Sequence, residues 1–256
     1  MNVHLVQIDS VWEDRSANHD KARQLIERAS PLPGSLIILP ETFSTGFSMN
    51  LAVTAEPEKG PTEQFLREMA AQYQSCVIGG VVTSASDGRG MNQSLVIAPD
   101  GSVLARYTKN NPFSLGGENQ VHLAGTGISL FEWQGLRIAP LICYDLRFPE
   151  LARSTIRAGA EVLVFIAAWP VKRIQHWITL LQARAIENLA YVIGVNRCGT
   201  DPEFTYTGRS IVVDPHGLII ADAAEQERVI SAQIDPAVLR AWRSQFPALR
   251  DAGIPS

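Results

Sequence analysis

Three side chains suited to nucleophilic chemistry each follow an apolar run of the kind that forms a β-strand. They are Cys143 after residues 136–142, Glu41 after 36–40 and Lys109 after 103–107. A cysteine attacks as its thiolate, which at neutral pH needs a base or a cation beside it. A carboxylate at a strand end is partly desolvated, which suits a general base, and an ammonium group there could favour the thiolate and hydrogen-bond an oxyanion. Together the three predict covalent catalysis by a cysteine.

The position of Cys143 fits a nucleophile at a sharp turn between a strand and a helix. Pro149, which follows shortly after, suits the first turn of a helix. Such a turn lifts a side chain to the edge of the sheet and points the next backbone amide, that of Tyr144, at a developing oxyanion. Taken singly, each residue also has an inert explanation, because free cysteines are often packed in cores and Glu41 and Lys109 could be solvated loop residues.

The three segments together resemble the motifs of the nitrilase, or carbon-nitrogen hydrolase, superfamily. They read Leu39-Pro40-Glu41-Thr42-Phe43, Tyr107-Thr108-Lys109 and Cys143-Tyr144-Asp145-Leu146-Arg147-Phe148-Pro149, in the family's order and at its usual spacing. The resemblance covers nearly the whole chain, because residues 183–188 and 196–197 also look like later family segments. With Trp169-Pro170 and His176-Trp177, the sequence is most similar to ω-amidases, which hydrolyse 2-oxoglutaramate and 2-oxosuccinamate.

This resemblance implies a four-layer αββα fold, usually dimeric, and a triad of Glu41, Lys109 and Cys143. Cys143 would attack an amide carbonyl to form a thioester and release ammonia, and water would then regenerate the enzyme. Glu41 would act as acid and base, while Lys109 and the Tyr144 amide would stabilise the oxyanion. A second family glutamate matches Glu118, which could orient Lys109. The alternative for this residue is a surface acid in a loop.

The residues that bind substrate are less well defined by the sequence. A keto-acid amide needs a cation for its distal carboxylate, and we expect this cation to be Arg173, with Lys172 or Arg209 as alternatives. The expected walls of the pocket are the aromatic residues Phe43, Phe113, Tyr144 and Trp169. Relatives often carry His two residues after the lysine, where this chain has Asn111, which cannot titrate near neutral pH. This change puts substrate positioning in question, not the core mechanism.

Other interpretations of the same residues stay open. The triad also serves the hydrolysis of nitriles and of N-carbamoyl amines or amino acids. From a different class, a catalytically silent binding subunit could keep the fold. His176 begins a helix and is expected to pack or cap. Cys76 and Cys198 lie in apolar runs without nearby charge and are expected to be inert core thiols.

Composition and charge exclude several classes of protein. The 256 residues are 46% hydrophobic and 19% charged, as in a folded globular chain, and the net charge of −4 is dispersed, so neither nucleic acid nor a membrane is an expected partner. No signal peptide or long apolar stretch is present, which predicts a cytoplasmic protein. Without a Cys-x-x-Cys pair, a histidine ligand motif or a Gly-rich phosphate loop, we expect no metal and no cofactor, and a small-molecule amide as the substrate.

Many short strands alternating with helices are needed to position these residues. Strand-like runs cover 3–8, 36–39, 76–83, 93–98, 103–107, 137–142, 162–167, 191–195, 210–213, 218–221 and 229–234. Apolar residues at helical spacing predict helices around 22–29, 65–70 and 177–185. The first of these helices should begin after Ser16 or Asn18 as its cap and end before Pro31.

Two turns join neighbouring strands and complete the predicted fold. Residues 98–101 and 214–217 each place Pro second and Gly fourth, which predicts two hairpins. Hairpins mixed with β-α units favour an α/β fold with two sheets back to back and helices on their outer faces, a four-layer αββα sandwich. We expect a single domain over residues 1–256, with the C-terminal segment, about 235–256, in oligomer contacts.

Overall fold

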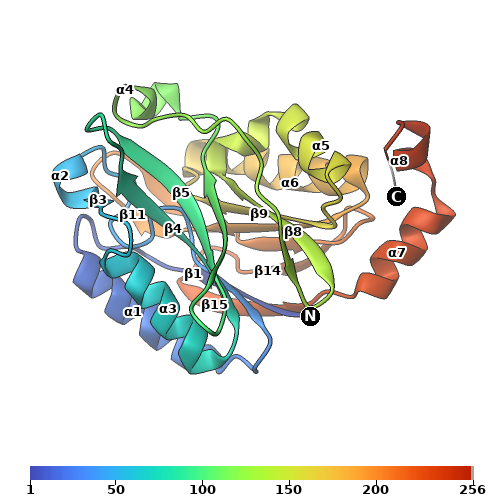
Figure 1. Ribbon diagram of the computed structural model, residues 1–256, viewed down its shortest axis with the longest axis horizontal. Coiled ribbons are helices and arrows are strands. Elements are labelled where there is room, and N and C mark those ends of the chain that lie inside the picture. The colour runs from blue at the N-terminus through green and yellow to red at the C-terminus, as the bar shows by residue number, and fades with distance from the viewer. Residues whose placement is uncertain (255–256) are drawn as a thin grey trace.

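Two β-sheets pack face to face at the centre of the molecule, and helices cover their outer faces (Figure 1). The structure, a computed structural model, describes residues 1–254. The first sheet contains β1 (Asn2–Gln7), β2 (Leu36–Ile38), β3 (Ala55–Glu56), β4 (Cys76–Ser84), β5 (Gly90–Ile97), β6 (Val103–Thr108) and β15 (Arg228–Gln233). The second sheet contains β7 (Phe131–Trp133), β8 (Leu136–Ile142), β9 (Val162–Ala167), β10 (Tyr191–Asn196), β13 (Ile211–Val213) and β14 (Ile219–Asp222). A separate hairpin is formed by β11 (Cys198–Thr200) and β12 (Thr205–Thr207).

The helices lie outside the two sheets and at one end of the molecule. The α-helices are α1 (Arg15–Ala29), α2 (Leu51–Thr54), α3 (Pro61–Tyr73), α4 (Glu118–Val121), α5 (Pro149–Arg157), α6 (Ile174–Asn188), α7 (Pro236–Gln245) and α8 (Ala248–Asp251). The 3-10 turns are η1 (Ser114–Gly116), η2 (Cys143–Arg147) and η3 (Val171–Arg173). The C-terminal helices α7 and α8 lie to one side of the sandwich (Figure 1).

The layers are held together by two clusters of buried apolar side chains. The strand order is β15-β1-β2-β4-β5-β6 in the first sheet, with β3 beside β4, and β14-β13-β10-β9-β8-β7 in the second. The larger cluster fills the space between the sheets and beneath α5 and α6, and the smaller one lies between the first sheet and helices α1 and α3. This arrangement is the four-layer αββα sandwich expected from the sequence.

Most of the regular elements agree with the sequence-based expectations. Each predicted strand-like run forms a strand, with its ends shifted by a few residues at most. Both predicted hairpin turns are present, because Gly101 N donates to Ala98 O at 2.9 Å and Gly217 N donates to Asp214 O at 2.9 Å. The strands that were not predicted, β3, β7, β11 and β12, are too short to carry a clear alternating pattern.

The predicted cap of α1 is wrong. Asp14, and not Ser16 or Asn18, caps this helix, since its side chain accepts from Ala17 N at 3.0 Å. Asn18 is instead fully buried and its Nδ2 donates to Ser44 O at 2.9 Å. Asn18 therefore lies within the helix, where its side chain hydrogen-bonds the neighbouring loop and does not cap the helix.

Strand direction places the candidate residues at matching strand ends. In the first sheet β2 runs parallel to β4, and β6 also runs in the direction of β4 because two antiparallel pairings connect them. Glu41 and Lys109 follow β2 and β6. In the second sheet β8, β9 and β10 are parallel, and Cys143 directly follows β8. The carboxyl ends of these strands carry the candidate site.

No helix within residues 1–254 is long and apolar enough to cross a membrane. The expected oligomer contacts of residues 235–256 stay a prediction, and the last two residues of that segment lie outside the described part of the chain.

Candidate active site

Cys143 is the first residue after β8 and begins the 3-10 turn η2. Its φ of +45° lies in the left-handed region that residues other than glycine rarely adopt. The Asp145 side chain braces the turn by accepting from Ile142 N at 3.1 Å. A backbone held in this way turns the side chain away from the strand, as in a nucleophile elbow. The predicted strand-to-helix turn is therefore present at Cys143.

Glu41 is buried beside Cys143 and has a different environment at each carboxylate oxygen. Its Oε1 accepts from Lys109 Nζ and from Asn92 Nδ2, both at 2.8 Å. Its Oε2 accepts from the backbone N of Ala168 at 2.8 Å. Because a carboxylate oxygen has two lone pairs, Oε1 is saturated and Oε2 keeps one acceptor position free.

Lys109 lies between two carboxylates in the interior. Its Nζ donates to Glu41 Oε1 at 2.8 Å and to Glu118 Oε2 at 2.7 Å, and all three side chains are almost fully buried. Burial alone would lower the pKa of Lys109, but Glu118 and Glu41 outweigh it and raise this pKa. Burial likewise opposes ionisation of Glu118, yet Lys109 brings the pKa of Glu118 below its usual value. The structure thus brings the predicted Glu118 into contact with Lys109.

Electrostatics around Cys143 favour the protonated thiol. Burial raises the pKa of Cys143 well above its ordinary value, the Glu41 charge raises it further, and Lys109 acts in the opposite direction. The expected effect of Lys109 on the thiolate thus has the right sign but is outweighed. Attack by Cys143 requires a base to take its proton, and Glu41 lies next to it.

A hydrogen-bonded carboxyl group behind Cys143 joins two of the predicted segments. Asp145 Oδ1 accepts from Asn111 N at 3.0 Å and from Asn111 Nδ2 at 2.9 Å, and Oδ2 accepts from the Tyr107 hydroxyl at 2.8 Å. Burial raises the pKa of Asp145 to about 6, although the hydrogen bonds from Asn111 and Tyr107 oppose this shift. Asn111, where relatives often carry His, therefore ties the Lys109 loop to the Cys143 turn.

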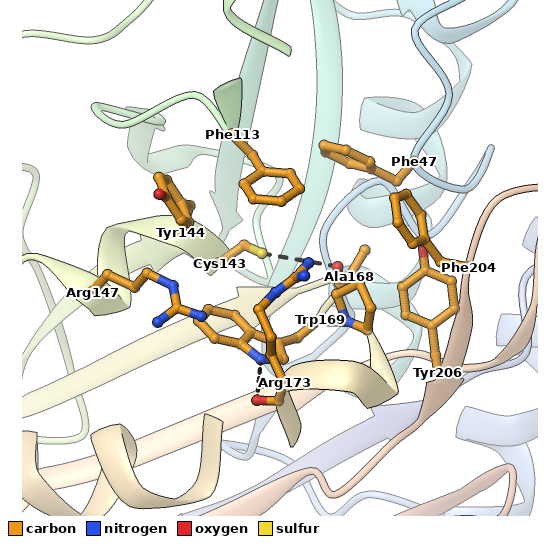
Figure 2. A pocket seen from close by; sticks show the side chains of 11 residues that line it. Phe47, Phe113, Cys143, Tyr144, Arg147, Ala168, Trp169, Arg173, Phe204 and Tyr206 are labelled. Carbon is orange, nitrogen blue, oxygen red and sulfur yellow. Dashed lines mark hydrogen bonds between the residues drawn. The ribbon is translucent and has the colours of Figure 1, made fainter. Parts of the chain in front are cut away.

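A cavity of about 360 Å³, measured with its opening to solvent, lies beside Cys143 (Figure 2). Its lining consists of Phe47, Phe113, Cys143, Tyr144, Arg147, Ala168, Trp169, Pro170, Arg173, Phe204 and Tyr206. Three of the expected aromatic walls, Phe113, Tyr144 and Trp169, are among these residues.

The fourth expected wall, Phe43, is not part of the cavity. It is fully buried between the first sheet and helices α1 and α3, with its ring centroid 5.8 Å from that of Phe65. Thr42, the residue between Glu41 and Phe43, has a φ of +44°, so the chain turns and directs the two side chains into different regions. Phe47 lines the cavity instead.

Two guanidinium groups reach the cavity. Arg173 lies with its Cζ 5.2 Å from the centroid of the Phe113 ring, and Arg147 lies with its Cζ 4.8 Å from the centroid of the Trp169 ring. Figure 2 shows the two groups on either side of the Trp169 indole. Neither forms a salt bridge with a carboxylate of residues 1–254, and Arg147 Nη2 meets His176 Nδ1 at 3.2 Å. Burial lowers the pKa of Arg147, and the Arg173 charge lowers it further.

The alternative cations lie elsewhere. Arg209 is held by Asp222, with Nε 3.0 and 3.1 Å from the two carboxylate oxygens. Lys172 is exposed and does not line the cavity. Of the three cations considered from the sequence, only Arg173 reaches the cavity.

The other two thiols differ from Cys143. Burial raises the pKa of Cys76 far above its ordinary value, and it raises the pKa of Cys198 to about 12. The expectation that no charge lies near Cys198 is wrong, because Asp9 and Glu227 contribute to its shift. Within residues 1–254 no group of three or more His, Cys, Asp or Glu side chains is arranged to hold a metal ion.

Several residues of the site had not been singled out from the sequence. Arg147 lies in the Cys143 segment itself, one helical turn after the thiol, and this spacing could have identified it. Asn92 is a polar residue at the start of an apolar strand, which is a weaker signal. The contact from Ala168 is a backbone one, for which the sequence gives no signal.

The family assignment rests on the whole length of the chain. The protein belongs to the carbon-nitrogen hydrolase family, whose model matches residues 2–244. Proteins of this class are hydrolases that act on carbon–nitrogen bonds other than peptide bonds.

Individual relatives are similar over nearly their full length. The chain is 39% identical over 253 residues to omega-amidase YafV of Yersinia enterocolitica, covering 98% of this chain and 96% of that protein. It is 31% identical over 250 residues to 2-oxoglutaramate amidase of Bacillus subtilis, covering 97% and 96%. The structure of a CN-hydrolase superfamily protein from Xanthomonas campestris, with an arsenic adduct in its active site, matches with a TM-score of 0.91 at 38% identity and covers 98% and 96%.

Proposed function

We propose that this protein hydrolyses small carboxylated amides of the ω-amidase type, with 2-oxoglutaramate or 2-oxosuccinamate as substrate and the 2-oxo diacid and ammonia as products. The observation that carries this proposal is a single juxtaposition. Cys143, in contact with the Glu41 and Lys109 cluster, opens onto a cavity that contains two guanidinium groups without an acidic partner. The similarity to an omega-amidase and a 2-oxoglutaramate amidase supports the same substrate class.

The first half of the reaction forms a thioester. Cys143 Sγ attacks the amide carbonyl carbon while its proton moves to the free acceptor position of Glu41 Oε2. The resulting oxyanion is stabilised by Lys109 Nζ and by the backbone N–H of Tyr144. Collapse of the tetrahedral intermediate breaks the carbon–nitrogen bond, and Glu41 returns the proton to the departing amine, which leaves as ammonia.

The second half hydrolyses the thioester. Glu41 takes a proton from water as the water oxygen attacks the thioester carbonyl. The carbon–sulfur bond then breaks, the proton returns to the sulfur, and the carboxylic acid leaves. Glu118 keeps Lys109 in place through both halves, because it accepts a second hydrogen bond from Nζ beside the one that Glu41 accepts.

Arg173 and Arg147 account for the carboxylate at the far end of the substrate. A guanidinium offers a fork of N–H donors that matches a carboxylate, and two such groups without an acid between them repel each other until an anion binds. Phe113 and Trp169 hold the guanidinium planes through their ring faces.

A substrate panel tests the proposal. Ammonia release would be measured with 2-oxoglutaramate, 2-oxosuccinamate, N-carbamoyl amino acids and simple nitriles. The highest kcat/KM is expected for the 2-oxo acid amides. A higher value for an N-carbamoyl compound or a nitrile would keep the triad chemistry and replace the substrate class.

The non-enzymatic alternative, a silent binding subunit, is tested by alkylation. An alkylating agent should modify Cys143 far faster than Cys76 and Cys198, because Cys143 is the one of these three thiols that lines the cavity, and Glu41 lies beside it. Equal, slow modification of all three thiols would favour the silent subunit.

We also propose that the protein is a homodimer that uses the C-terminal segment. An apolar surface is formed by Ile186 on α6, Leu218 in the β13–β14 turn, and Trp242 and Phe246 at α7. His216 connects its two halves, since its ring lies 4.2 Å from that of Trp242.

Size measurements with matched variants test the dimer. Phe246→Asp, at a side chain that is 48% exposed, should shift sedimentation towards the monomer, whereas Val11→Asp, at 42% exposure on the α1 side, should not. Identical sedimentation of the two variants would exclude this surface.

The three free thiols support the cytoplasm as the location, because disulfides are rare in that reducing compartment.

A further inference from the structure

The side chain of Asn92 connects the two carboxylates of the site. Asn92 lies on β5 and is almost fully buried. Its Nδ2 donates to Glu41 Oε1 and to Glu118 Oε1, both at 2.8 Å. Lys109 Nζ donates to the same two residues. The amide and the ammonium group therefore bridge one pair of carboxylates and close a ring of hydrogen bonds.

The side-chain amide of Asn92 has one favourable orientation, with its nitrogen towards the two carboxylates. Asn92 Oδ1 is buried and accepts no hydrogen bond from residues 1–254. A buried carbonyl without a donor costs free energy. The two hydrogen bonds that the N–H groups donate to the carboxylates offset this cost. Rotation of the amide by half a turn would bring Oδ1 against Glu41 and Glu118 and replace two attractive contacts with two repulsive ones. The Asn92 backbone also accepts from Lys109 N at 2.9 Å, which sets the position of the lysine relative to the amide.

We propose that Asn92 is a positioning residue for amide hydrolysis, which holds Glu41 and Glu118 on either side of Lys109 and leaves Glu41 Oε2 free to take the Cys143 proton. This inference rests on the roles proposed above for Glu41, Lys109 and Cys143. Being neutral, the amide orders the carboxylates without adding positive charge. A second cation in its place would cancel the negative charge that draws the proton from Cys143.

Loss of the amide should change how the carboxylates titrate. With only Lys109 between them, two buried carboxylates repel each other and bind a proton more readily. Besides Lys109, which belongs to the ring, the titratable groups that face it are Cys143, His122, Tyr206 and Asp145. Burial lowers the pKa of His122 and raises the pKa of Tyr206, so both stay neutral near pH 7. The acid limb of any reaction that needs ionised Glu41 should therefore move to higher pH.

Two variants and a control on the same strand test the proposal. Asn92→Leu removes both donors, and Asn92→Asp keeps the shape but adds a third carboxyl group. Ser94→Ala is the control, because Ser94 lies two residues along β5, is fully buried and has a hydroxyl without a partner in the described chain. For each protein, kcat/KM for the best amide and the rate of Cys143 alkylation by iodoacetamide would be measured against pH.

In both Asn92 variants the acid limb should shift upward by about one to two pH units in both measurements, because each carboxylate loses a donor. The kcat/KM of Asn92→Leu at pH 7 should fall by roughly ten- to a hundredfold, mainly through kcat. Ser94→Ala should reproduce the wild-type profiles. If Asn92→Leu fails to fold, Asn92→Asp, which preserves the volume, gives the answer.

Profiles that superimpose on the wild type, with activity lost only in proportion to the folded fraction, would overturn the proposal and leave Asn92 a packing residue. The alkylation measurement needs no amide substrate. An upward shift of its acid limb in a protein that cleaves no amide would therefore support the role of Asn92 and reject the proposed function.

Discussion

The inner and outer parts of the site treat charge in opposite ways. In the inner part, Lys109 is held between Glu41 and Glu118 at 2.8 and 2.7 Å, and Asn92 occupies further acceptor positions of both carboxylates. In the outer part, Arg147 and Arg173 are packed on aromatic rings, and neither pairs with a carboxylate in the described chain. The paired charges of the inner part are held in a fixed arrangement, which suits catalysis. The unpaired guanidinium groups of the outer part are free to bind an anionic ligand.

This difference predicts different consequences of mutation in the two parts. Damage to the inner part should affect all substrates alike, because every amide needs the same nucleophile and base. Damage to the outer part should depend on whether the substrate carries a carboxylate.

The largest effect is expected from the inner part. Cys143→Ala should abolish turnover, and Glu41→Gln should be comparably severe, with losses of at least roughly 10³-fold in kcat, because the nucleophile and its base act as a unit. Ammonia release by purified, folded variants is the measurement, and Cys76→Ala is the control that should keep its activity per folded molecule. Turnover at the wild-type rate in either variant would refute the triad.

A smaller and selective effect is expected from the outer part. Arg173→Ala and Arg147→Ala should each lower kcat/KM for carboxylated amides by about ten- to a hundredfold, as expected for a charge-assisted hydrogen bond worth roughly 1.5–3 kcal/mol. Small uncharged amides should lose little. Arg209→Ala is the control, since Asp222 already holds that guanidinium. Equal losses on both kinds of amide would remove the distinction between the two parts.

A third effect concerns the hydrogen bonds of Asp145, which join the Lys109 loop to the Cys143 turn. Tyr107→Phe removes a buried hydrogen bond to Asp145 and should lower the free energy of unfolding by about 1–3 kcal/mol in urea titrations. The pKa of Asp145 is raised to about 6, above the 3.8 of a free side chain, so wild-type stability falls as pH rises through this range.

Tyr107→Phe should steepen that fall, because the lost bond favoured the ionised carboxyl. The difference between variant and wild type should therefore be larger at pH 8 than at pH 5. Tyr73→Phe, at a hydroxyl with only an exposed contact to Gln72, is the control. A difference that does not change with pH would show that Asp145 is not the partner responsible.

The smallest effect is expected from exhaustive chelation, which should leave kcat/KM unchanged. Lys109 already supplies the positive charge between Glu41 and Glu118, where a divalent ion would otherwise be needed to hold two carboxylates together. Activity after dialysis against a strong chelator is the measurement. Loss of activity that a divalent ion restores would mean that the inner part needs a bound metal ion.

Sequence-based prediction worked best where a few neighbouring residues determine the local structure. The apolar run before Cys143 and the Pro and Gly of the two hairpin turns predicted elements that are present, because strand periodicity and turn chemistry act over a few residues. It failed for Phe43, whose position depends on a left-handed turn at Thr42, a residue type with no preference for that conformation. It also failed for the α1 cap, because the loop that claims Asn18 lies more than twenty residues along the chain.

The contacts that order the site were the hardest to foresee. Asn92 meets Glu41 and Glu118 only because the fold brings together residues that are 51 and 26 positions away from it in the sequence. Ala168 contributes a backbone group that almost every residue has. Such roles depend on tertiary position and not on residue type. The family resemblance supplied the candidate catalytic residues, and the fold was needed to find the residues that contact them.

The left-handed backbone at Cys143 lowers the stability of the fold at the position of the proposed nucleophile. Glycine adopts that conformation without strain, whereas a side chain there costs about 1–3 kcal/mol. A chain under selection for stability alone would therefore drift towards glycine at position 143 and lose its sulfur. In a set of natural variants, glycine at this position would identify proteins that have kept the sandwich and abandoned the chemistry.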